Sequence, residues 1–140
     1  MLSHIFNVDI AGYWRDKNKS GISAHSGVYF VYETTYNQDT DTVTLHRLIY
    51  IGESENVNSR IMTHDRYNDW LKYVRTGNEL CFSTGQVGSP NRARVESAYI
   101  FNHKPPANIE YANAFPFDQT TVISTGRINL LNTNFTVNRT

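Results

Sequence analysis

The stretch GVYFVYETTYNQDTDTVTLHRLIYIG, residues 27–52, contains two segments of strand-like composition separated by turn-forming residues. Residues 27–36 and 42–51 are rich in β-branched and aromatic side chains, which favour extended backbone on a half-buried surface. The intervening NQDTD consists of residues that commonly form turns. The sequence therefore predicts a β-hairpin over this stretch.

The position of the turn also predicts which residues of the hairpin face each other. If the turn is centred between Asp39 and Thr40, Tyr29 lies directly opposite Tyr50, and both rings project from the same side of the sheet. An extra residue in either strand, a β-bulge, would change this pairing. Two phenol hydroxyls are thus expected close together at the open end of the hairpin.

Helical segments are predicted directly after the hairpin. Gly52 is followed by ESEN, which supplies capping residues for a helix over about residues 56–66. Arg60 and His64 lie one turn apart in this segment, beside its apolar stripe. The segment DWLKYVR, residues 69–75, predicts a second short helix.

The remaining segments predict one more strand, one long helix and less regular ends. ELCFSTGQV at 79–87 predicts a third strand, and SPNRARVESAYIFNHKPP at 89–106 predicts a helix that the two prolines end. Glu96 lies in the middle of that helix. IFNVDI at 5–10 predicts a short strand, and residues 111–140 predict one or two strands or a short helix.

These segments together predict a mixed α/β (α+β) fold with a small central antiparallel three-stranded sheet flanked by helices. With 140 residues and no repeat, the chain is expected to form one domain over 1–140. Residues 27–110 would form its core, and residues 111–140 a C-terminal extension packed on that core.

Composition and charge limit the function classes. The formal net charge is +0, which argues against a protein that binds nucleic acid mainly through bulk electrostatics but is compatible with one local positive site. The single cysteine, Cys81, cannot form an intramolecular disulfide and is expected to be a small core residue. The chain lacks a signal-like N-terminal segment and any apolar run near the ~20 residues of a membrane span, so a soluble cytoplasmic protein is expected.

The two ends of the hairpin carry a family resemblance. GVY at 27–29 and YIG at 50–52 resemble the two halves of the signature of the GIY-YIG nuclease superfamily. Val28 replaces isoleucine in the first half and keeps its β-branched apolar character. Gly27 and Gly52 are expected to allow close approach of the backbone at the strand ends.

The downstream spacing extends the resemblance over roughly residues 27–110. Arg60 and His64 lie where the family places an arginine and, in many members, a histidine, and Glu96 lies where it places a metal-binding glutamate. The resemblance implies a metal-dependent endonuclease that cleaves DNA with Mg²⁺ or Mn²⁺ bound by Glu96. It also implies a supporting hydrogen bond from Asn108, which follows the proline pair.

Phosphodiester hydrolysis independently requires these residue types. A carboxylate such as Glu96 can hold a hard divalent cation, and the planar guanidinium of Arg60 matches phosphate oxygens. By resemblance, Tyr29 activates the attacking water and Tyr50 donates a hydrogen bond to the phosphate. Because free tyrosine has a pKa of about 10, a phenolate needs nearby positive charge, or His64 must relay the proton. Either Tyr29 or His64 therefore remains a candidate for the base.

One departure from the family favours a second hypothesis. Many members carry a lysine between YIG and the helix arginine, whereas this chain has Glu53, Ser54 and Glu55 there. The two acidic residues and the neutral net charge favour a catalytically inactive nucleic-acid or protein-interaction module. If the chain is an enzyme, a homodimer or a partner protein is a candidate source of additional DNA affinity.

Overall fold

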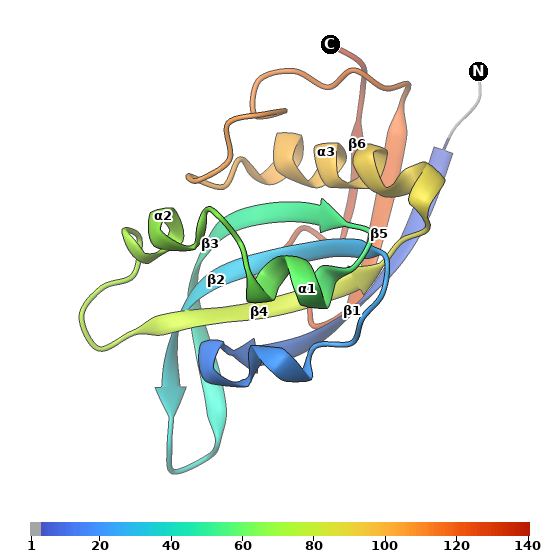
Figure 1. Cartoon of the computed structure of the whole chain (residues 1–140). Coiled ribbons are helices and arrows are strands. Elements are labelled where there is room, and N and C mark those ends of the chain that lie inside the picture. The colour runs from blue at the N-terminus through green and yellow to red at the C-terminus, as the bar shows by residue number, and fades with distance from the viewer. Residues whose placement is uncertain (1–3) are drawn as a thin grey trace.

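The computed structural model describes residues 4–140, and its main feature is one curled six-stranded sheet (Figure 1). The strands are β1 (His4–Arg15), β2 (Gly27–Asn37), β3 (Thr42–Ser54), β4 (Glu79–Gln86), β5 (Thr120–Gly126) and β6 (Asn134–Val137). They lie in the order β3-β2-β4-β1-β5-β6. The helices are short: α1 (Val57–Met62), α2 (Tyr67–Leu71) and α3 (Arg92–His103), with 3-10 helices at Asp16–Gly21 and Ser89–Asn91.

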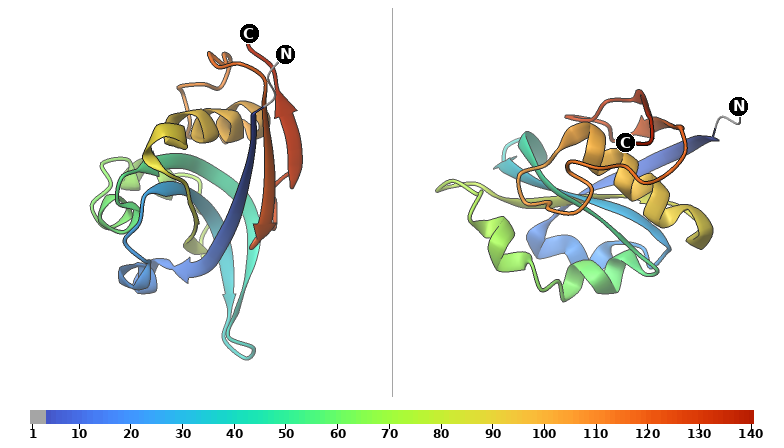
Figure 2. Two further views of the ribbon diagram at one scale, coloured as in Figure 1. Left: turned by 90° about the vertical axis from the view of Figure 1, so that its right-hand side faces the viewer. Right: turned by 90° about the horizontal axis from the view of Figure 1, so that it is seen from above.

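The predicted three-stranded sheet flanked by helices is wrong, because the sheet has six strands and the described chain is mostly β. β1 is much longer than the predicted strand at 5–10. Its first half pairs in parallel with β5, and its second half pairs antiparallel with β4. β1 thereby joins β5 and β6 to the three predicted strands, and the six strands curl into a mixed half-barrel (Figure 2).

The hairpin of β2 and β3 is confirmed, but its predicted register holds only near the turn. Tyr36 pairs with Val43 there, as a turn centred between Asp39 and Thr40 requires. Two register shifts farther along β3 place Tyr29 opposite Gly52, so the predicted pairing of Tyr29 with Tyr50 is wrong. Because two single-residue bulges together restore the side-chain alternation, both tyrosines still lie on one face of the sheet.

The two faces of the sheet are covered by different helices. Val28, Phe30 and Tyr32 alternate along β2 and pack in the cluster beneath α3. Tyr29 and Val31 point to the opposite face, where they pack in the cluster that includes residues of α1 and α2. The right-hand view of Figure 2 shows α3 on one side of the sheet and α1 and α2 on the other. The site described below lies where the edge strand β3 meets both layers.

The helices occur where they were predicted but begin and end differently. The side chain of Asn56 caps α1 by accepting a hydrogen bond from the backbone N–H of Ser59. α1 then ends at Met62 instead of continuing to residue 66, and α3 begins after a 3-10 turn at Ser89–Asn91. Within residues 4–140, none of the helices has the length and apolar character needed to cross a membrane.

Candidate functional site

The side chains predicted to act in catalysis gather at one end of the hairpin. They are Tyr29 on β2, Tyr50 on β3, Arg60 on α1, His64 just after α1, and Glu96 on α3. The ring centroid of Tyr29 lies 6.2 Å from that of Tyr50, and the His64 ring lies 5.8 Å and 5.5 Å from these two rings. Elements far apart in the chain therefore contribute to one cluster.

Tyr29 and His64 form a buried hydrogen-bonded pair at the base of this cluster. The Tyr29 hydroxyl oxygen lies 2.7 Å from Nε2 of His64, and the backbone N–H of Arg66 donates to Nδ1 of His64 at 3.0 Å. Since Nδ1 accepts, the neutral imidazole carries its proton on Nε2 and donates it to the Tyr29 oxygen. The His64 side chain is 0% exposed, so neither ring nitrogen is free to contact a substrate.

The surroundings shift the pKa values of both partners toward their neutral forms. Burial, reinforced by the positive charge of Arg60, lowers the pKa of the His64 imidazole to about 4. Burial also raises the pKa of the Tyr29 phenol, and the neighbouring Tyr50 raises it further, while the Arg60 guanidinium lowers it. Both groups are therefore uncharged at neutral pH, and Arg60 is the nearby group that favours a phenolate.

The two signature glycines make room for this arrangement. A Cβ atom on Gly52 would lie 2.2 Å from Cζ and from the hydroxyl oxygen of Tyr29, so the phenol ring lies directly over this glycine. A Cβ atom on Gly27 would lie 2.0 Å from the backbone oxygen of Gly85 on β4. Both positions therefore require the absence of a side chain, one for a ring and one for a neighbouring strand.

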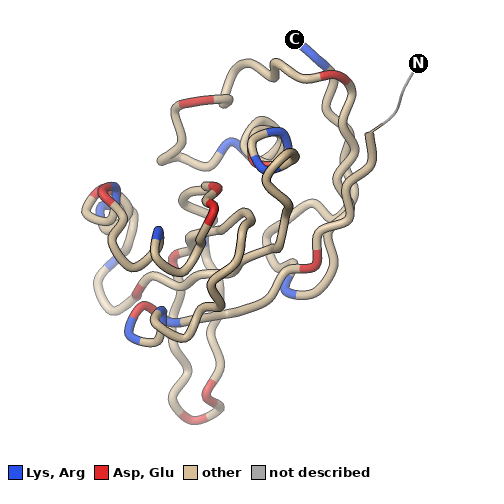
Figure 3. The backbone as a smooth tube through the Cα atoms, turned by 45° about the vertical axis from the view of Figure 1, so that its right-hand side comes forward, with Lys and Arg blue, Asp and Glu red and all other residues tan. Residues whose placement is uncertain are grey.

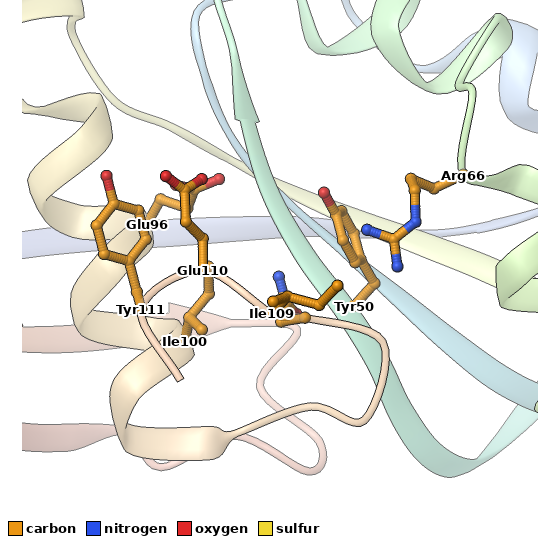
Figure 4. A pocket seen from close by; sticks show the side chains of 8 residues that line it. Tyr50, Arg66, Glu96, Ile100, Ile109, Glu110 and Tyr111 are labelled. Atoms are coloured by element: carbon orange, nitrogen blue, oxygen red, sulfur yellow. The ribbon is translucent and has the colours of Figure 1, made fainter. Parts of the chain in front are cut away.

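A pocket of about 240 Å³ opens beside Tyr50. It is lined by Tyr50, Arg66, Glu96, Ile100, Asn108, Ile109, Glu110 and Tyr111. Figure 4 shows the carboxylates of Glu96 and Glu110 toward one end of the pocket and the guanidinium of Arg66 at the other, next to the Tyr50 ring. The pocket is thus acidic at one end and basic at the other.

Glu96 is the carboxylate whose surroundings favour a bound cation most clearly. Burial raises the pKa of Glu96 to about 8, and the charges of Glu53 and Glu110 contribute to the rise. A hard divalent cation would offset this unfavourable negative charge, and oxygen ligands suit Mg²⁺ and Mn²⁺. Among residues 4–140 no group of three or more His, Cys, Asp or Glu side chains is arranged to hold a metal ion, so water and substrate oxygens would complete the coordination.

The acidic residues after Gly52 repel a phosphate less strongly than the sequence suggests. The Nε of Arg92 on α3 donates to Oε2 of Glu53 at 2.6 Å, and another N–H of Arg92 donates to the Ser26 hydroxyl. This ion pair partly offsets the charge of Glu53. Glu55 is exposed at the surface. The local negative charge near Tyr50 is therefore smaller than the acidic sequence implies.

Arg60 and Asn108 take different positions around the cluster. Arg60 forms an ion pair with Asp65 (Nη2 to Oδ1, 2.9 Å), and its side chain is 40% exposed. Asn108 pairs with the free edge of β3: its Oδ1 accepts from the Ile51 N–H, and its Nδ2 donates to the Ile51 carbonyl, both at 2.9 Å. Asn108 thus fixes the strand between Tyr50 and Gly52, the kind of support that the sequence resemblance implies.

Three neighbours were not predicted as site residues. Arg66 and Glu110 line the pocket, and the Trp70 ring lies 4.4 Å from the His64 ring and 5.3 Å from the Tyr50 ring. Arg66 lies two residues beyond His64, a weak signal because exposed arginines are common. The aromatic cluster around Trp70 had no sequence signal, because α2 returns to β3 only through tertiary packing.

Comparisons of the chain with protein-family models, with curated proteins and with solved structures give no match.

Proposed function

We propose that the chain is a metal-dependent endonuclease that hydrolyses DNA phosphodiester bonds at a single-metal site. One observation carries the proposal: two tyrosines, an arginine and a half-buried glutamate from β2, β3, α1 and α3 lie at one end of the hairpin, where Tyr50 and Glu96 line a pocket. Hydrolysis of a phosphodiester needs a proton acceptor, positive charge for the phosphate and a ligand for a divalent cation. These side chains supply all three.

Each residue of the chain has a distinct task in this proposal. Tyr50 and Arg60 bind the phosphate, because the Tyr50 hydroxyl borders the pocket and Arg60 provides positive charge beside both phenols. Glu96, with Glu110 nearby, holds Mg²⁺ or Mn²⁺. The cation stabilises negative charge on the phosphate and the leaving oxygen when it is bound. His64 is a positioning residue, because it donates a hydrogen bond to Tyr29 and is not among the residues that line the pocket.

Tyr29 is the better of the two candidate bases. Attack of water forms a new bond from water oxygen to phosphorus, breaks the bond from phosphorus to the leaving oxygen, and requires a proton to leave the water. The Tyr29 oxygen accepts a hydrogen bond from His64. The positive charge of Arg60 lies nearby, and both interactions favour the phenolate. Both nitrogens of His64 are already engaged. Because the pKa of Tyr29 is raised, the rate of hydrolysis should increase with pH above neutrality.

A second candidate is a nucleic-acid or protein-interaction module without catalysis. The ion pair of Arg60 with Asp65 favours it, because a phosphate would have to displace Asp65 to bind Arg60. Figure 3 shows cationic and anionic residues interspersed along the described chain, and the net charge is +0. Nonspecific affinity for DNA should therefore be weak, and a second copy or a partner protein would have to add affinity.

The two candidates are separated by a cleavage assay on duplex, branched and single-stranded DNA, with Mg²⁺, Mn²⁺ or EDTA. The endonuclease predicts metal-dependent cleavage that Tyr29→Phe, Arg60→Ala and Glu96→Ala each reduce strongly. Arg47→Ala is the matched control, because Arg47 is an exposed arginine on β3 away from the pocket. Cleavage of none of these substrates, or equal cleavage by all the variants, would leave the interaction module as the better account.

A further inference from the structure

The basic end of the pocket is formed by Arg66, a residue that the proposed mechanism does not yet use. Arg66 lies between α1 and α2, and its guanidinium faces the pocket from the end opposite Glu96 (Figure 4). Its guanidinium carbon lies 5.5 Å from the centroid of the Tyr50 ring. Arg66 is therefore adjacent to the Tyr50 ring, which borders the pocket.

Two hydrogen bonds hold this guanidinium in place. Its Nε donates to Oδ2 of Asp69 at 2.7 Å, and its Nη2 donates to the backbone oxygen of Ala107 at 2.7 Å. The second bond links α2 to the segment that runs along the edge of β3. Within residues 4–140, the N–H groups of Nη1 have no hydrogen-bond partner. A pre-positioned guanidinium with free donors is well suited to bind an oxyanion.

The local charge balance also distinguishes Arg66 from Arg60. Asp69 is shared between two cations, because it accepts from Arg66 and forms an ion pair with Lys72 at 3.3 Å. One carboxylate opposite two cations leaves net positive charge at this end of the pocket. Arg60, in contrast, faces Asp65 in a one-to-one pair. The less neutralised of the two arginines is thus the one that lines the pocket.

We propose that Arg66 binds a phosphate of the nucleic acid in this pocket, beside Tyr50, and so positions the substrate relative to Glu96. This inference rests on the proposed endonuclease function. It adds a second phosphate contact: Arg66 holds the phosphate from within the pocket, and Arg60 contacts it from the side of the Tyr29 phenol. The acidic end then faces the reacting phosphate from the side opposite the guanidinium.

The test measures binding of a fluorescein-labelled oligonucleotide by anisotropy, in EDTA and over a range of salt concentrations. Arg66→Gln should weaken binding about tenfold and reduce the slope of log K against log salt by roughly one, as expected for the loss of one phosphate contact. Arg66→Lys keeps the charge but lacks the planar fork, so its effect should be intermediate. Arg47→Gln is the matched control: it makes the same substitution at an exposed arginine on β3 outside the pocket, and should weaken binding less than about threefold.

Tryptophan fluorescence and the melting temperature establish that each variant is folded. The inference is overturned if Arg66→Gln and Arg47→Gln give the same affinity and the same salt slope while the wild type binds and cleaves DNA, a result that leaves the proposed function intact. If the wild type neither binds nor cleaves any of the substrates, the inference and the proposed function are both overturned.

Discussion

At the scale of single residues, the site depends on the absence of a side chain at Gly52. Gly52→Ala would place a methyl group about where the Tyr29 ring lies, so the ring must move or the strands must separate. We expect a loss of about 2 kcal/mol in the free energy of unfolding, as for other overpacked cores, and loss of cleavage. Urea denaturation measures the first effect. Gly88→Ala is the control, since its Cβ would meet nothing closer than 3.9 Å, and equal stability of the two variants would contradict the account.

His64 makes stability depend on pH in a predictable direction. Its pKa is 6.5 in the unfolded chain and about 4 in the folded one, so between these pH values the unfolded chain binds more protons. Stability is therefore lost as pH falls through this window, by about 3 kcal/mol from this one group. Unfolding measured from pH 7.5 to pH 4 should show a shallower loss for His64→Gln than for the wild type. Identical pH profiles would show that His64 is not buried as described.

The candidate site residues could be proposed from the sequence, because they occur in local patterns. The GVY and YIG tripeptides and the spacing to Arg60 indicated Tyr29 and Tyr50 as site residues. The partners of these residues were not predictable. The hydrogen bond between Tyr29 and His64 and the ion pair of Arg92 with Glu53 join elements far apart in the chain, which no local pattern encodes.

At the scale of elements, Asn108 pairs with the edge of β3 and, with the backbone bond from Ala107 to Ile49, holds the segment after α3 against it. Asn108→Ala would leave the N–H and C=O groups of Ile51 without their partners, at a cost of about 1–3 kcal/mol in the free energy of unfolding. Hydrogen exchange at the Ile51 amide should accelerate as well. Asn91→Ala, at an exposed asparagine whose side chain makes no capping bond, should change stability by less than about 0.5 kcal/mol. Unchanged exchange at Ile51 would contradict the proposed support.

The hairpin was predictable because composition and turn residues agree over residues 27–51. The register near its open end was not. The two bulges in β3 are geometric features of the sheet, and the segment around His46 and Ile49 has no residue type that marks them. The face on which Tyr29 and Tyr50 lie was nevertheless predicted correctly, because two shifts of one residue cancel in the alternation of side chains.

At the scale of the whole molecule, the terminal strands and the site belong to one sheet. Phe135 on β6 is 7% exposed and packs in the cluster beneath α3, whereas Trp70 packs in the cluster on the opposite face. If the molecule unfolds cooperatively, Phe135→Ala should lower stability by about 3 kcal/mol. In a Trp14→Phe background, Trp70 fluorescence and far-UV circular dichroism should report the same shift. Asn134→Ala, at an exposed neighbour, is the control, and a Trp70 transition that stays in place would contradict a single cooperative unit.

The architecture was the least predictable level. A local pattern identifies strands, but the parallel pairing of β1 with β5 joins segments more than a hundred residues apart. The prediction of a small sheet flanked by helices assumed that residues 27–110 form a complete core. In the structure, β4 has β1 on its other side, and the sheet continues from there through β5 to β6.

The central claim is that Glu96 belongs to a phosphodiesterase site, and one measurement tests it most directly. The rate at which supercoiled plasmid is nicked in Mn²⁺ is measured for the wild type and for Glu96→Gln, which keeps the size of the side chain but removes its charge. The account predicts metal-dependent nicking by the wild type and a rate at least about 100-fold lower for the variant. Equal rates for the two proteins, or no nicking by the wild type, would contradict it.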